Sequence, residues 1–281
     1  SGDVFRCYKL ATSFDEDTWV TATATSPDSP LSHHALIYVA QPESEAAVDA
    51  LAAQFDGEGW GECQNGIGIP SVVLSGWVPG MSKIPYPEDA AYLVPKGSIL
   101  LLQMHYSGVG ATEKELEQKT DQPQIHLWTL PKGQLPKFDV AVRPYADHSF
   151  EIPLGETQTT NKSFTVSADE NIFAVVSHQH VIGTQTSLML ERKDGSEACL
   201  SNIPKWDFDW QLIYNYTEDD LVQINPGDKI KLSCTYPYTE DWVKAQLGNA
   251  APDPLPETLI WGEASYEEMC ISYVWSMRPL I

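Results

Sequence analysis

The feature that most constrains the fold is a repeated alternation of apolar and polar residues in short segments. Thr18 to Thr25 alternates with a period of two, which is typical of a strand with one buried face. The connections are marked by 20 prolines and 18 glycines, which favour turns. Similar patterns predict strands at 33–40, 98–106, 125–130, 138–144, 171–183, 186–192, 209–216, 229–236 and 269–277. A helix is predicted at 43–55 and a shorter one at 112–119, so the chain is predicted to be all-β.

Length and a weak internal similarity predict two domains. With 281 residues the chain is long for one sandwich and sufficient for two domains of about 140 residues. A segment at 94–98 leads into one predicted strand, and a similar segment at 224–228 leads into another. Residues 130–136 are the best candidate linker. We therefore expect one antiparallel β-sandwich over residues 1–135 and a second over residues 136–281.

The side-chain composition limits the partners of the chain. Lys and Arg number 17 against 39 Asp and Glu, so the formal net charge is −22. Such a surface repels phosphate backbones and anionic membranes, so nucleic-acid and membrane partners are not expected. Hydrophobic residues make up 42% of the chain, which is enough to form real cores. No stretch approaches the ~20 apolar residues of a membrane-spanning helix.

The five cysteines lack the spacing of a thiolate metal site. They are Cys7, Cys63, Cys199, Cys234 and Cys270, and they include no CxxC pair. We expect two disulfides and one remaining thiol, although spacing alone leaves the pairing open. Because disulfides persist in oxidising compartments, we expect a secreted or periplasmic protein.

Five of the seven histidines fall into three short clusters. His178 and His180 are separated by one residue in a strand-like segment, so both rings would point to the same side and could reach one ion. His33 and His34 are adjacent, so both could bind one metal only where the strand bends or ends. His105 stands alone in an apolar run. Each cluster also has a plain alternative, as ordinary core and surface histidines.

A methionine near the C-terminus adds a ligand type that favours copper. Met269 enters the last predicted strand, where a methionine usually serves packing. Joined to His178 and His180, it would complete a His2Met site whose soft thioether favours Cu(I) over zinc. The histidines of the first half would form an all-histidine site, which suits electron delivery.

Other catalytic signatures are absent from the sequence, which has no HExxH, phosphate-binding Gly-rich loop or GxSxG elbow. The acidic residues form no convincing pair for glycoside hydrolysis, and a solvated acidic surface explains them better. Trp206, Phe208 and Trp210 could line a pocket, although alternate aromatics in a sandwich strand are mostly core. His126 and His148 lie apart from the clusters and are interpreted as structural.

Taken together and in order, these motifs resemble the copper type II, ascorbate-dependent monooxygenases, the family of the peptidylglycine-hydroxylating and dopamine β-hydroxylating enzymes. The resemblance covers nearly the whole chain. It runs from Phe5-Arg6-Cys7-Tyr8 through the histidine clusters and Trp261-Gly262-Glu263 to Glu268-Met269-Cys270. The segment Trp206-Asp207-Phe208-Asp209-Trp210-Gln211 is more similar to the bacterial branch than to the animal enzymes.

The resemblance implies two jelly-roll-like domains with one copper ion each and a cleft between them. The copper that transfers electrons would be held by His33, His34 and His105. The copper that binds dioxygen, where a substrate C–H bond is hydroxylated, would be held by His178, His180 and Met269. Ascorbate would re-reduce both coppers. The resemblance also implies the disulfides Cys7–Cys63 and Cys234–Cys270, with Cys199 left unpaired.

One departure from the family pattern concerns the substrate. Peptide-amidating members carry an arginine two residues before the HxH pair, where this chain has Val176. They carry an asparagine two residues after the methionine, where this chain has Ile271, although Tyr273 matches their tyrosine and is a candidate catalytic residue. A buried substrate carboxylate would lack its partner here, so a less polar or differently charged small molecule is expected in place of a peptidylglycine.

The sequence therefore predicts a monomeric copper monooxygenase that acts on a small molecule with dioxygen and an ascorbate-type reductant. One alternative is a non-catalytic copper carrier or redox protein with the same ligands. Another is a structural or adhesive β-sandwich protein that binds no metal.

Overall fold

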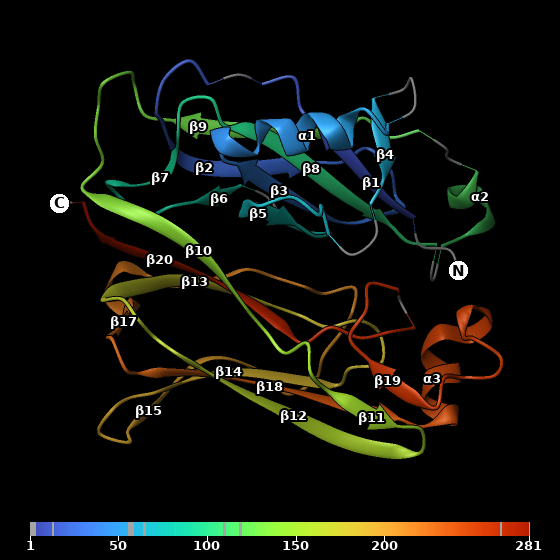
Figure 1. The fold of residues 1–281 in the computed structure, drawn as a ribbon. Helices are drawn as coiled ribbons and strands as arrows, with labels where there is room; N and C mark the ends of the chain where they lie inside the picture. Colours follow the sequence, from blue (N-terminus) through green and yellow to red (C-terminus); the bar gives the residue numbers. More distant parts are fainter. Residues whose placement is uncertain are drawn as a thin grey trace. The chain divides into compact units, whose positions relative to one another are not determined.

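The computed structural model describes residues 4–12, 14–55, 59–63, 66–81, 83–108, 111–117, 120–264 and 266–280. These residues form an all-β chain, as predicted, with many paired strands and only short helices (Figure 1). They divide into two compact units. Arg143–Arg278 forms a C-terminal unit, and the described residues up to Val142 form an N-terminal unit together with those from Pro279. None of the helices in the described chain is long and apolar enough to cross a membrane.

The N-terminal unit contains two sheets. One has the strand order β4–β1–β8–β3–β5, and in the other β2 pairs with β6, β7 and β9. The strands are β1 (Val4–Lys9), β2 (Thr18–Ser26), β3 (Ser32–Ala40), β4 (Trp60–Glu62), β5 (Ser71–Trp77), β6 (Ile84–Pro85), β7 (Ala90–Val94), β8 (Ile99–Tyr106) and β9 (Gln124–Thr129). A buried hydrogen bond of 2.6 Å joins Thr23 Oγ1 on β2 to Ser75 Oγ on β5, so the two sheets pack face to face.

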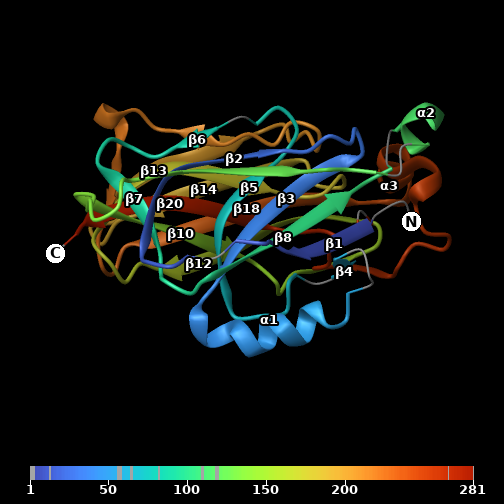
Figure 2. The ribbon, with the colours of Figure 1, turned by 90° about the horizontal axis from the view of Figure 1, so that it is seen from above.

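A short helix, α1 (Glu45–Ala52), runs along one side of the first sheet (Figure 2). Its Val48 is buried in a small core with Phe5 and Leu101. The helix predicted at 43–55 is confirmed in its centre, but it begins at Glu45 because Pro42–Ser44 forms a 3-10 turn. The second predicted helix is the single turn α2 (Glu113–Leu116), and residues 118–119 lie outside the described chain.

The C-terminal unit also contains two main sheets. One has the order β16–β13–β20–β10, with β17 also paired to β13, and the other has the order β12–β18–β14–β15. The strands are β10 (Phe138–Ala146), β12 (Glu156–Thr165), β13 (Glu170–His178), β14 (Gln185–Glu191), β15 (Glu197–Ile203), β16 (Tyr214–Asn215), β17 (Val222–Ile224), β18 (Lys229–Tyr238) and β20 (Ile271–Pro279). A small third sheet joins β11 (Glu151–Pro153) to β19 (Thr258–Ile260), and α3 spans Glu240–Leu247.

Alternating burial along the strands explains why this unit is a sandwich. Every second residue of β18 is buried, so one face of the strand points inward. Its Leu232 and Tyr236 share one core with Val175 and Val274 from the other sheet. Antiparallel pairing dominates in both units. A parallel pairing occurs where the start of β10 meets β7 within the N-terminal unit.

Both disulfides implied by the resemblance are present. Cys7 bonds to Cys63 in the N-terminal unit, and Cys234 bonds to Cys270 in the C-terminal unit. Cys199 is a free, exposed cysteine, as expected. Each bridge therefore closes a loop within one unit, which restricts the unfolded state of that unit.

Two strand predictions in the C-terminal unit are wrong. The segment predicted at 171–183 ends as a strand at His178, and within 209–216 only Tyr214–Asn215 pairs with a neighbour. Helix α3 was not predicted. In the first segment the Glu268 side chain accepts backbone N–H groups beyond His178. In the second, the Gln211 side chain bonds to the His178 ring and to the backbone oxygen of Phe208.

Candidate metal centre

Three of the predicted ligands meet at one end of the first sheet. His105 lies on β8, the strand between β1 and β3, and pairs directly with His34 on β3. The β3–β8 register shifts between Ser32 and His34, so His33 is the extra residue of a β-bulge. A bulge bends the strand locally. This bend lets adjacent histidines, which would otherwise face opposite sides, both approach His105.

The ring nitrogens of these histidines have the spacing of metal ligands. The Nδ1 atom of His34 lies 3.4 Å from Nδ1 of His33 and 3.2 Å from Nδ1 of His105. One ligand atom from each residue can be chosen so that all three lie within 4.8 Å of one another. Metal–nitrogen bonds of roughly 2.0–2.1 Å at near-tetrahedral to trigonal angles would separate nitrogens by about 3.3–3.6 Å. The separation of 3.4 Å falls within this range, and that of 3.2 Å lies just below it.

Neighbouring side chains hold the three histidines in place. The ring of Phe5, which pairs with His105 from the other side, stacks on it with centroids 4.2 Å apart. The carboxylate of Asp121 accepts hydrogen bonds of 3.0 Å from the hydroxyls of Ser32 and Tyr106. Because these two residues precede His33 and follow His105, Asp121 ties together the two strand ends that carry the histidines.

The second pair, His178 and His180, is brought together at the end of a strand. His178 is the last residue of β13, and His180 lies beyond it. Their ring centroids are 5.2 Å apart, and the planes of the two rings are nearly perpendicular. The expected proximity is therefore present, but the predicted reason, strand alternation across both residues, is wrong.

Hydrogen bonds to the rings of this pair determine which nitrogens face a ligand. Nδ1 of His178 lies 2.6 Å from Oε1 of Gln211, and Nδ1 of His180 lies 3.1 Å from the backbone carbonyl oxygen of Glu267. Because a carbonyl oxygen only accepts, each neutral ring carries its proton on Nδ1 and its lone pair on Nε2. In His33, His34 and His105 the Nδ1 atoms lie close together, whereas in His178 and His180 Nδ1 is hydrogen-bonded and Nε2 carries the lone pair. The sequence does not contain this distinction.

The aromatic segment after β15 also supports the pair. The indole nitrogen of Trp206 donates to the backbone oxygen of His180 at 2.9 Å, and Phe208 packs edge-on against the His180 ring. Trp206 is buried, whereas Trp210 remains 66% exposed. The core interpretation therefore fits Trp206, and Trp210 is a surface residue.

The structure adds one residue that sequence reasoning missed, Glu268. It is fully buried, and burial raises the pKa of its carboxyl to about 8, while backbone N–H groups that donate to it oppose that shift. Oε2 accepts from the backbone nitrogens of His180 at 2.7 Å and Met269 at 3.1 Å. Oε1 accepts from those of Ile182 and Gly183, each at 2.8 Å. The sequence feature that could have indicated this residue is its position directly before the candidate ligand Met269.

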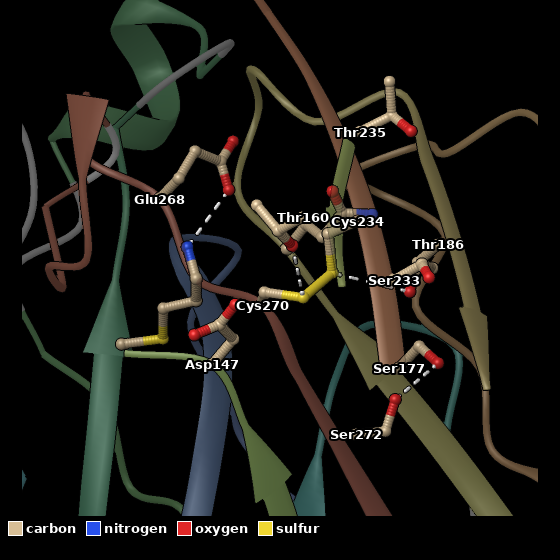
Figure 3. The surroundings of a disulfide bond; sticks show 12 residues. Asp147, Thr160, Ser177, Thr186, Ser233, Cys234, Thr235, Glu268, Cys270 and Ser272 are labelled. Carbon is tan, nitrogen blue, oxygen red and sulfur yellow. Dashed lines mark hydrogen bonds between the residues drawn. A yellow bond between two sulfur atoms is a disulfide. The ribbon is translucent and has the colours of Figure 1, made fainter. Parts of the chain in front are cut away.

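Met269 is placed by its backbone. Figure 3 shows Glu268 beside the Cys234–Cys270 disulfide, in the segment that leads into β20. The Met269 carbonyl accepts a 2.8 Å hydrogen bond from the hydroxyl of Tyr236. The backbone nitrogens of Met269 and His180 bond to the same oxygen of Glu268, so these two backbones are neighbours. Coordination by the Met269 thioether remains a prediction.

The residues expected to contact substrate lie on neighbouring strands. In the β13–β20 register Val176 pairs with Tyr273, and His178 pairs with Ile271. Directly paired residues, and residues two apart, share a face of a sheet. All four therefore lie on one face, whereas the intervening Ser177 and Ser272 hydrogen-bond to each other at 2.9 Å in the interior (Figure 3). Burial, followed by the charge of Glu263, raises the pKa of Tyr273 to about 12.

Comparison with known families identifies the C-terminal part of the chain. Residues 154–279 match the copper type II ascorbate-dependent monooxygenase, C-terminal domain. The match confirms, over these residues, the resemblance that the motifs indicate. The matched residues include His178, His180 and Met269.

The other comparisons add no functional information. The comparison with curated proteins gave no match. Among solved structures, a crystal structure of dimeric latent PorU from Porphyromonas gingivalis is similar with a TM-score of 0.20 and 8% identity. That alignment covers 98% of this chain but 25% of that chain, and at this TM-score it carries no argument.

The donor sets fit copper. Imidazole nitrogens suit copper, and the trio of His33, His34 and His105 brings three of them together with the spacing given above. In the C-terminal unit the rings of His178 and His180 lie close together, and the Glu268 carboxylate joins the backbones of His180 and Met269. The free Cys199 lies on β15, outside both groups. No thiolate set therefore competes with these ligands in the described chain.

Proposed function

We propose that this chain is a copper-dependent monooxygenase that hydroxylates a C–H bond of a small organic substrate with dioxygen and an ascorbate-type reductant. The observation that carries the proposal is the family match of residues 154–279, in a chain whose other unit gathers three histidine nitrogens. The two disulfides fit a secreted or periplasmic protein. The expected stoichiometry is two copper ions per chain.

In this proposal the two histidine groups have separate roles. The electron-transfer copper is held by His33, His34 and His105, and the dioxygen-binding copper is held by His178, His180 and Met269. Bound copper supplies one-electron redox chemistry and, as Cu(I), affinity for dioxygen. The chain itself orients the ligands, because Gln211 and the Glu267 carbonyl fix the tautomer and rotation of two rings.

The face shared by His178, Val176, Ile271 and Tyr273 indicates the type of substrate. Val176 and Ile271 offer apolar surface and no positive charge. Since its pKa is raised, Tyr273 stays a neutral hydroxyl near pH 7 and can donate or accept one hydrogen bond. We therefore propose a largely apolar substrate with one neutral polar group and no carboxylate beside the reacting carbon.

The test is an oxygen-incorporation assay on the copper-loaded full chain. Copper is counted first, and ascorbate, ¹⁸O₂ and a panel of small apolar alcohols, amides and amines are then supplied, with a C-terminal glycine peptide as comparison. The proposal expects two ions per chain and one ¹⁸O atom in a hydroxylated product, with the glycine peptide unreacted. Two bound ions without any product would favour a copper carrier, and no bound copper would favour a metal-free β-sandwich.

A further inference from the structure

The turn after β13 is held by one buried carboxylate. Beyond His178 the chain no longer belongs to a strand, yet the backbone nitrogens of His180, Ile182 and Gly183 remain in the interior. A buried N–H without an acceptor is costly. All three donate to Glu268, whose side chain is fully buried. The carboxylate therefore replaces the sheet ladder over this turn.

The shape of the turn is matched to this carboxylate. Gly183 donates to Glu268 Oε1, and a Cβ atom at this position would collide with the side chain of Gln179. Gln179 is itself buried, and its amide nitrogen donates to the backbone oxygen of Gln185 at 2.9 Å. The turn thus has little room to shift without breaking several hydrogen bonds together.

The fourth N–H donor to Glu268 belongs to Met269, the candidate thioether ligand, and it connects the turn to the proposed metal site. The nitrogen of Met269 donates to Oε2, the same oxygen that accepts from His180. One oxygen atom therefore links the backbone of a candidate imidazole ligand to the backbone of the candidate thioether ligand. The Cys234–Cys270 disulfide fixes the next residue, but it bonds to β18 and makes no link to the histidine turn.

We infer that Glu268 is a positioning residue that sets the distance between the His178–His180 pair and the Met269 thioether, so that the soft ligand reaches the same copper ion. The inference rests on the proposed function, because it requires a His2Met site. A glutamate suits this role because its two oxygens together accept four N–H donors. A glutamine of equal size would turn an N–H group toward two of these donors.

The experiment compares Glu268→Gln with a matched control, Glu170→Gln. Glu170 is another buried glutamate of the unit, and its carboxylate bonds to the side chains of Arg143 and Ser276, away from the histidine turn. Both variants of the full chain are loaded with Cu(I) alone. Cu(I) affinity is measured by chelator competition, and the sulfur contribution to copper X-ray absorption reports thioether coordination. Circular dichroism confirms that each variant is folded at the temperature used.

The expected result is specific to one site. Glu268→Gln should lose the sulfur contribution and weaken binding of one Cu(I) ion by roughly 10–100-fold, with the second ion retained. Glu170→Gln should lower the melting temperature and leave both ions and the sulfur contribution intact. If folded Glu268→Gln keeps wild-type affinity and sulfur coordination, the inference is overturned.

A second variant decides the case in which Glu268→Gln does not fold. Glu268→Asp keeps the carboxyl group but shortens the side chain, so it cannot reach all four donors, and it should show the same selective loss. If both variants unfold while Glu170→Gln folds, Glu268 serves folding alone and the positioning role is wrong. Absence of a sulfur contribution in the wild-type protein would instead refute the His2Met site itself, and with it the proposed function.

Discussion

The two histidine groups are assembled by different physical means. In the N-terminal unit, sheet register sets His34 opposite His105, and a bulge turns His33 toward them. In the C-terminal unit, β13 ends at His178, and hydrogen bonds from other segments fix the backbone and ring of His180. The first group is a product of strand pairing, and the second is a product of a few side-chain contacts.

This difference shows where each group is vulnerable. Ladder geometry is shared among many backbone hydrogen bonds, so most single substitutions outside the trio and its supports Phe5 and Asp121 should barely move its rings. The C-terminal group depends on individual residues such as Gln211 and Glu268. Substitutions of these residues can change the metal–ligand geometry without removing a ligand. The N-terminal site is thus built by sheet register and the C-terminal site by individual contacts, so the two should respond differently to substitution.

The largest effect is expected from removing a ring of the trio. His105→Ala should abolish copper binding at the N-terminal site. This loss of affinity exceeds the roughly 10–100-fold expected when a residue that hydrogen-bonds to a ligand is removed. The C-terminal copper should remain, while hydroxylation stops because the second electron is lost. Metal analysis together with the ¹⁸O assay measures both results. His126→Ala is the control, since His126 is exposed on β9 and lies outside the trio. Retention of two tightly bound ions by His105→Ala would remove this residue from the ligand set.

The next effect concerns the soft ligand of the C-terminal site. Met269→Ile should keep the fold and the N-terminal copper, weaken Cu(I) binding at the C-terminal site and abolish hydroxylation. Met277→Ile is the matched control, because Met277 is a buried methionine of β20 in the same unit. Normal turnover in Met269→Ile would show that this methionine only packs.

The contrast also explains what the sequence could predict. Alternating burial is a local property, so most strands and the all-β class follow from the sequence. The bend that unites His33 with His34 was recognised as a requirement, but its cause, a register shift between β3 and β8, depends on a partner far away in the chain. Glu268 looked like an ordinary acidic residue, because three of its four donors come from a turn that it meets only after folding. Register and buried hydrogen bonds are long-range properties that a single sequence does not display.

Removal of the two disulfides should affect copper binding at the two sites differently. Replacing both cysteines of either bridge with serine should lower the free energy of unfolding of that unit by about 4 kcal/mol, given sequence separations of 56 and 36 residues. Loss of Cys234–Cys270 should also weaken Cu(I) binding, because Cys270 follows Met269 directly. Loss of Cys7–Cys63 should leave the affinity of the trio unchanged in protein that is still folded. Denaturant unfolding combined with Cu(I) competition measures both. Equal effects of the two double variants on Cu(I) affinity would contradict the contrast.

The smallest effect should come from Gln211→Ala, which removes no ligand. Without the Gln211 oxygen, the His178 ring loses the acceptor that holds its proton on Nδ1, so the ring can rotate and place the proton on Nε2. Affinity at the C-terminal site should fall by roughly 10–100-fold, or about 1.4–2.7 kcal/mol. Gln223→Ala, at an exposed glutamine of the same unit, should change nothing. Chelator competition measures the affinity, and an unchanged value would mean that His178 is held by its strand, as the trio is. In that case His178, like the trio, would be positioned by its strand, and only His180 would depend on individual contacts.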